Sequence, residues 1–123
     1  MKNIDIVTIV TAFQKTDGTL TLPAKVAWTR RVNYKKLMEA KTIIDEAMQE
    51  IQRKYADDEH SVVDGENRKV KPEYLEAFAK EQTEILTQDT DVDIKKVSIE
   101  DLGDVTLTDA QMDTIAFMIE EGD

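Results

Sequence analysis

The chain of 123 residues contains no cysteine, and it has only two prolines, four glycines, one histidine and one tryptophan. The lack of cysteine excludes disulfide scaffolds, iron–sulfur clusters, cysteine-ligated zinc and thiol nucleophiles, and it agrees with a reducing compartment. The sequence also has no glycine-rich phosphate loop, no Walker-type lysine and no nucleophile elbow. We therefore expect a protein that is not an enzyme and that needs no cofactor.

The N-terminal stretch has no long hydrophobic run. Asp5, Thr8, Thr11 and Gln14 interrupt its apolar residues, which is typical neither of a signal peptide nor of a membrane span. We expect a soluble cytoplasmic protein that does not enter a membrane. The length fits a single domain over residues 1–123.

Two acidic segments match metal sites only in part. Residues 89–93 alternate acids as a calcium loop does, and Glu100 takes its twelfth position, but Ile94 stands where the loop requires glycine. His60 follows three acidic residues, and a metal site would require Asp57, Asp58 or Glu59 to converge with its ring. We interpret residues 89–93 as a strand edge protected by charge and His60 as a surface residue, and we predict no metal site.

Charge is distributed unevenly along the chain, whose net charge is −10. Residues 24–55 carry eight basic and four acidic side chains, whereas residues 89–123 carry eleven acids and two lysines. Such asymmetry keeps a small protein soluble and lets its own segments attract each other. In a second interpretation, the acidic end imitates nucleic acid and occupies a basic cleft on a protein partner. The candidate partner-binding residues are Asp101, Asp104, Asp109, Asp113, Glu120 and Glu121.

The apolar pattern predicts an α+β fold built on a long antiparallel helical hairpin. Residues 24–55 contain no glycine or proline, so we expect about thirty residues of helix, or ~45 Å. Its apolar seam comprises Leu37, Ala40, Ile44, Ala47 and Ile51. Extending this seam backward adds Arg30 and Asn33, and we favour the view that the stripe leaves the core there over the view that these side chains reach a specific partner. Pro72 begins a second helix. Its packing residues are Leu75, Phe78, Gln82, Ile85 and Leu86.

Shorter elements complete the predicted fold. Asn3 can cap a helix that buries Ile6, Val7, Val10 and Phe13, although alternating Ile4, Ile6 and Thr8 leave a strand as an alternative. Residues 16–19 predict a turn. Residues 61–70 predict a β-hairpin whose turn lies at residues 64–65 or 66–67. A lone hairpin is marginal in water, so we expect it to be mobile or completed by another subunit.

The C-terminal third predicts a strand over residues 92–97, a turn at 102–104 and a helix that begins after Thr108. Thr108 and Gln111 form a capping box, and Leu107 and Met112 have the spacing of a hydrophobic staple. The residues expected to face inward are Met112, Ile115, Ala116 and Ile119.

One cluster in the basic segment has the chemistry of a ligand site. It brings aromatic and cationic side chains together near a helix start, as sites that hold phosphates and stack bases do. The candidate residues are Trp28, Arg30, Arg31, Tyr34 and Lys35. The modest local charge suits a nucleotide-sized ligand rather than a nucleic-acid duplex. In the alternative interpretation, the aromatic rings pack in the core and the cations extend around them.

The chain resembles a family of small uncharacterised proteins encoded by phages and prophages of Gram-positive bacteria. The resemblance rests on residues 2–7, 22–26, 31–33, Leu37, 92–97 and 107–121. The similarity spans nearly the whole chain. It implies a phage gene whose product is made in the cytoplasm of the bacterial host. Such families carry no assigned catalytic residues.

Two functions are compatible with this resemblance. One is a stoichiometric inhibitor that disables a host defence by occupying a protein surface or by sequestering a nucleotide messenger. The other is a virion or assembly accessory protein, such as a connector, tail accessory or chaperone. We favour the inhibitor, because the charge exceeds what a buried ring interface normally tolerates. In both cases we expect a homodimer or higher homo-oligomer, which would cover the apolar stripe and complete the hairpin.

Overall fold

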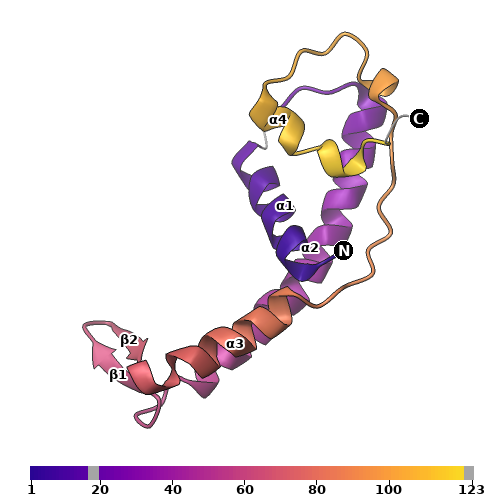
Figure 1. Cartoon of the computed structure of the whole chain (residues 1–123). Coiled ribbons are helices and arrows are strands. Elements are labelled where there is room, and N and C mark those ends of the chain that lie inside the picture. The colour runs from indigo at the N-terminus through magenta and orange to yellow at the C-terminus, as the bar shows by residue number, and fades with distance from the viewer. Residues whose placement is uncertain (17–19, 121–123) are drawn as a thin grey trace.

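The computed structural model describes residues 1–16 and 20–120, and it has the predicted α+β fold (Figure 1). The elements are α1 (Asn3–Thr16), α2 (Ala24–Lys54), β1 (Ser61–Asp64), β2 (Asn67–Val70), α3 (Leu75–Leu86) and α4 (Asp109–Asp113), with 3-10 turns η1 (Pro72–Tyr74), η2 (Ile99–Leu102) and η3 (Ala116–Met118). The predicted turn at 16–19 includes residues 17–19, which lie outside the described residues.

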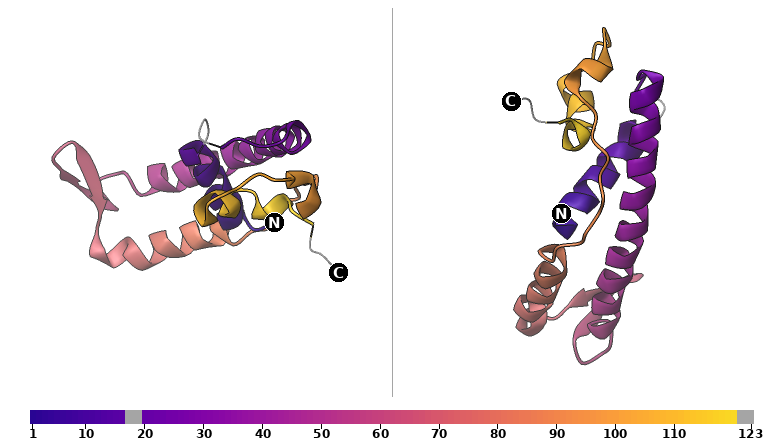
Figure 2. Two further views of the ribbon diagram at one scale, coloured as in Figure 1. Left: turned by 90° about the horizontal axis from the view of Figure 1, so that it is seen from above. Right: turned by 90° about the vertical axis from the view of Figure 1, so that its right-hand side faces the viewer.

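Helix α2 is the spine of the molecule. At one end it packs against α1 and the C-terminal segments (Figures 1 and 2). We call this part of the molecule, formed by α1, this end of α2 and the C-terminal segments, the body. Its other end runs beside α3 and leads to the hairpin, and we call residues 45–87 the arm. The predicted bounds of α2 are confirmed, since the helix starts directly after Pro23 and the Tyr55 amide bonds back to the Ile51 carbonyl.

Two apolar clusters form the core of the body. In the first, Ile6, Val10 and Phe13 of α1 meet Leu37, Ala40 and Ile44 of α2. In the second, Val26 of α2 meets Val97, Leu102, Ile115 and Met118 of the C-terminal third. Residues 3–16 are therefore helical because one face of the helix fills the first cluster, and the alternative strand is wrong.

Asn3 does not use its side chain as the expected helix cap. Its amide Nδ2 donates to the Ile85 carbonyl at 2.8 Å, and its Oδ1 accepts from the Thr90 hydroxyl at 2.6 Å. The side chain thus joins the start of α1 to the end of α3 and to the segment that follows it.

The predicted strand over residues 92–97 is wrong. Residues 91–96 are extended but unpaired with any described strand, and only Val97 forms a bridge, parallel to Ile119. The backbone of Lys95 instead bonds to Asn33, whose Nδ2 donates to the Lys95 carbonyl and whose Oδ1 accepts from its amide, both at 2.9 Å. Asn33 is fully buried, so the apolar stripe does not leave the core at that position, and the favoured interpretation of Asn33 is wrong.

The predicted start of the C-terminal helix is confirmed. The Gln111 amide donates to Thr108 Oγ1 at 3.1 Å, and the Thr108 amide donates to Gln111 Oε1 at 3.0 Å. However, α4 is only five residues long, and the chain continues into η3. This change of helical register exposes Ala116, which was expected to face inward, and buries Met118 in its place.

In the arm, the predicted hairpin is confirmed, with Asp64 opposite Asn67 and a two-residue turn between them. The central pair is Gly65-Glu66, one position away from either expected turn, because Gly65 takes the positive φ of 63° that the turn requires. Helix α3 follows Pro72 as expected, but Leu75 is 48% exposed and does not pack inward. It is the first residue of α3.

Candidate ligand-binding groove

Four of the five predicted ligand residues line one groove. The end of α1, residues 20–22 and the first turns of α2 enclose about 570 Å³, which is within the usual range for small-molecule sites. Its lining residues are Phe13, Leu20, Leu22, Ala24, Ala27, Trp28, Arg30, Arg31 and Tyr34. Lys35 is exposed and not among them, since it lies one position further around α2 than Tyr34.

The floor of the groove is an aromatic cluster centred on Phe13. The Phe13 ring lies 4.9 Å from that of Tyr34 and 5.9 Å from that of Phe117, measured between centroids. The Arg30 guanidinium lies over the Phe13 ring at 4.2 Å, a distance typical of cation–π contacts. Packing therefore explains Tyr34 and half-buried Arg30 in part, as the alternative interpretation expected.

The rim of the groove is different, because its side chains are free to meet a ligand. Trp28 is 67% exposed, so its indole does not belong to the core. Arg31 is exposed one helical turn further along the same face of α2. Packing does not account for these two side chains.

The groove is electropositive as far as the structure describes it. Its described lining includes two arginines and no carboxylate. A guanidinium matches the geometry of phosphate oxygens and forms paired hydrogen bonds with them. An apolar wall behind two such groups strengthens their attraction for an anion.

Phe13, Leu20 and Leu22 were not predicted as site residues. Phe13 reaches the groove through the packing of α1 on α2. Leu20 and Leu22 lie just before α2 and pack against the second apolar cluster. The helical spacing of Phe13 with Val10 and Ile6 is the signal in the sequence that could have placed it against α2.

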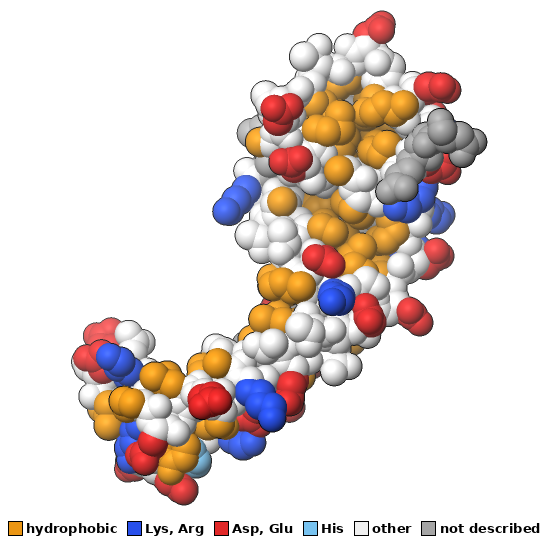
Figure 3. Space-filling view, in the orientation of Figure 1, with side chains coloured by type: hydrophobic (Ala, Val, Ile, Leu, Met, Phe, Trp, Pro, Cys, Tyr) orange, Lys and Arg blue, Asp and Glu red, His pale blue; other side chains and the backbone are white. Residues whose placement is uncertain are grey.

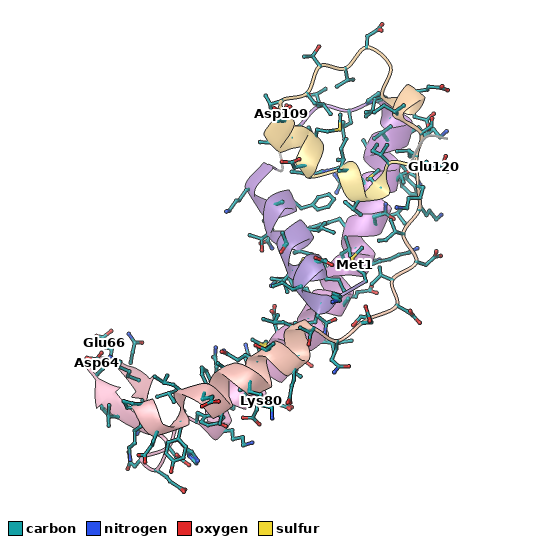
Figure 4. The ribbon with its side chains drawn as sticks, in the orientation of Figure 1. Met1, Asp64, Glu66, Lys80, Asp109 and Glu120 are labelled. Carbon is teal, nitrogen blue, oxygen red and sulfur yellow. The ribbon has the colours of Figure 1, made fainter. Side chains whose placement is uncertain are left out.

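The predicted acidic partner residues differ in how far the fold engages them. Asp101 is used within the fold, where it accepts from the Ser98 amide at 3.0 Å and pairs with Lys25 at 3.1 Å. The hydrogen bond from the Ser98 amide has the larger effect and that from Lys25 the smaller, and together they hold the pKa of Asp101 below its usual range. Asp109 and Glu120 lie at opposite ends of the segment from α4 to η3 (Figure 4). Asp104 and Asp113 are also exposed, whereas Glu121 lies outside the described residues.

His60 is not the plain surface residue that we expected. Its ring packs against Tyr55 and Tyr74, with centroids 5.2 and 4.7 Å away, and only 21% of its side chain is exposed. Its Nδ1 lies 2.6 Å from Asp57 Oδ1, and this hydrogen bond lowers the pKa of Asp57. Ligand atoms of Asp57, Glu59 and His60 lie within 4.8 Å of one another. The ring contacts and the bond to Asp57 give His60 a structural role at the turn between α2 and β1.

Within residues 1–16 and 20–120, no helix is both long and apolar enough to cross a membrane. The chain matches no protein-family model, no curated protein and no solved structure.

Proposed function

We propose that the protein is a non-enzymatic binding protein that holds a nucleotide-sized anion in the groove between α1 and α2. The observation that carries this proposal is the convergence of Trp28, Arg30 and Arg31 on one groove of suitable volume. An exposed indole offers a stacking surface for a base, worth about 1–3 kcal/mol per base. The exposed Arg31 guanidinium can form paired hydrogen bonds with a phosphate group, and Arg30 adds positive charge to the same groove.

The chemistry of the lining favours holding the ligand over converting it. Apart from the Tyr34 hydroxyl, the described lining offers no group commonly used as an acid, a base or a nucleophile, since it has no histidine, carboxylate, serine or lysine. General acid–base and nucleophilic catalysis use those groups. The groove therefore suits sequestration of an intact ligand.

The resemblance to phage proteins suggests a biological setting for such binding. A phage product made in the bacterial cytoplasm, at concentrations matching those of a defence messenger, would act stoichiometrically by removing the free nucleotide. Inhibition through the acidic end finds less support, because Asp109 and Glu120 lie apart and Asp101 is engaged within the fold.

Fluorescence titration tests the proposal directly, since Trp28 is the only tryptophan in the chain and lines the groove. The titrants are mononucleotides, cyclic mononucleotides and cyclic dinucleotides, with inorganic phosphate for comparison. We expect saturable quenching by at least one nucleotide and a weaker response to phosphate alone. No saturable change with any nucleotide up to millimolar concentration would overturn the proposal.

Arg31→Glu is the matching variant, because Arg31 is exposed and its replacement leaves the core intact. We expect the dissociation constant to rise at least tenfold, which corresponds to about 1.4 kcal/mol. Arg53→Glu is the control, since Arg53 is also an exposed arginine and lies at the far end of the same helix. Equal losses in both variants would indicate a general effect of charge and not the groove.

A further inference from the structure

The outer edge of β1 presents an unpaired backbone donor and acceptor. Asp64 pairs with Asn67 across the turn, and Val62 pairs with Lys69. Residues that flank a two-residue turn form a hydrogen-bonded pair, and such pairs alternate along the ladder, so the N–H and C=O of Val63 point away from β2. No backbone group elsewhere in the described chain bonds to Val63.

The same strand exposes apolar side chains on both of its faces. Val62 is 49% and Val63 is 67% exposed, and successive residues of a strand point to opposite faces. Figure 3 shows apolar side chains over this end of the arm, among charges of both signs. An open edge flanked by exposed valines is a template for pairing with another strand.

We propose that a second copy of this chain docks on the outer edge of β1, so that two hairpins form one four-stranded antiparallel sheet. In the two-fold arrangement, Val63 lies opposite the partner's Val63, and their backbones exchange two hydrogen bonds. Val62 then lies opposite the partner's Asp64, so no like charges meet. A hairpin of two four-residue strands is marginal alone, and doubling the sheet stabilises it.

Charge selects this edge over that of β2. A two-fold pairing through β2 would place Arg68 opposite the partner's Arg68, and like charges directly opposite each other are destabilising. The β1 edge carries no such pair.

Charge also favours contact through the tip of the arm, residues 53–80, over contact through the rest of the molecule. Residues 53–80 hold six basic and seven acidic side chains, so the remainder of the chain carries a net −9. Docking at the tips keeps the two negative bodies apart by more than the Debye length of about 8 Å. A second copy can therefore approach the hairpin with little repulsion.

The absence of cysteine allows a clean cross-linking test. In the proposed pair the two Val63 Cα atoms lie about 5.5 Å apart, within the range that a disulfide bridges. Under mild oxidation, we expect most of the Val63→Cys chains to form covalent dimers. Ile43→Cys is the control, because Ile43 is 69% exposed but lies on α2 outside the hairpin. Equal cross-linking of the two variants would overturn the proposal.

Sedimentation equilibrium gives an independent measurement on the full chain. Val63→Lys would place two ammonium groups opposite each other, and we expect the dimer dissociation constant to rise at least tenfold, with Ile43→Lys leaving it unchanged. The circular dichroism spectra of the wild-type chain, Val63→Lys and Ile43→Lys should be the same, since Val63 and Ile43 are mostly exposed. A wild-type monomer at high micromolar concentration, or a dimer insensitive to Val63→Lys, would refute the docking.

Discussion

The side chain of Asn33 is fully buried, and both ends of its amide bond to the backbone of Lys95. These bonds join positions 62 residues apart in the sequence. They hold the extended segment 91–97 against α2. In place of strand pairing, they satisfy the backbone N–H and C=O of Lys95. A single polar residue in the apolar stripe thus positions the C-terminal third against the body.

Asn33→Ala should be strongly destabilising. It leaves a donor and an acceptor of Lys95 without their protein partners, and it removes a side chain that is fully buried. We expect a loss of about 2–4 kcal/mol in the free energy of unfolding, measured by urea denaturation. Gln49→Ala, at an exposed position of the same helix, should change it by less than about 0.5 kcal/mol. Similar small effects at both positions would show that water replaces the Asn33 bonds.

Three carboxylates have lowered pKa values, and from these we predict how stability depends on pH. The pKa of Asp57 is lowered by the hydrogen bond to His60, that of Glu81 by the one from Lys54, and that of Asp101 by the Ser98 amide. A pKa lower in the folded than in the unfolded state adds stability above the unfolded value, about 4, which is lost as pH falls through the folded value. We therefore expect urea midpoints that change little between neutral pH and about pH 5 and fall below about pH 4.

Asp101→Asn separates one of these contributions from the others. The amide oxygen of asparagine still accepts from Ser98, but the side chain no longer titrates or pairs with Lys25. We expect a lower midpoint at neutral pH and a shallower fall in acid. An unchanged acid slope would mean that Asp101 contributes nothing to the pH dependence.

At the scale of elements, α4 depends on its cap because it is only five residues long. Thr108 satisfies the Gln111 amide, and a helix this short has few other bonds to hold it. Thr108→Ala should therefore cost about 1 kcal/mol of stability, measured by thermal or urea unfolding. Thr106→Ala, at an exposed position just before the helix, is the control. No measurable difference between the two variants would show that the cap is dispensable.

Elements specified by local signals were predictable from the sequence. The unbroken stretch of α2, the capping box at Thr108 and the hairpin around Gly65 each follow from neighbouring residues. The segment 91–97 was not predictable, because a strand needs a partner and here the packing offers Asn33 of a helix instead. A β-prone composition alone does not distinguish these outcomes.

The groove was predictable in the same partial way. Trp28, Arg30, Arg31 and Tyr34 lie within two turns of one helix, so the sequence alone brings them together. The wall contributed by Phe13 depends on how α1 packs, which is a tertiary property. The sequence therefore identified the aromatic and cationic site residues on α2, but it did not identify Phe13, which α1 contributes.

At the scale of the molecule, the stability of the body and that of the arm have different sources. Both buried apolar clusters lie in the body, whereas α3 has no buried residue. The tip of the arm rests instead on an aromatic cluster, in which Tyr55 contacts Phe78 at 5.2 Å and His60 packs between Tyr55 and Tyr74. Lys54 adds an ion pair with Glu81 at 2.6 Å. Fewer buried contacts imply a lower free energy for local opening.

Native-state hydrogen exchange should therefore resolve two units. We expect the amides of β1, β2 and the first half of α3 to exchange through local opening, while those of α2 from Val26 to Ile44 exchange only through global unfolding. Phe78→Ala should accelerate exchange in the arm alone, because Phe78 packs on Tyr55 at the tip and touches neither core cluster. Nucleotide titration of Trp28 should be the same in this variant, since the groove lies in the body. If Phe78→Ala instead accelerates hydrogen exchange uniformly across α2, the arm and the body unfold as one cooperative unit that α2 connects.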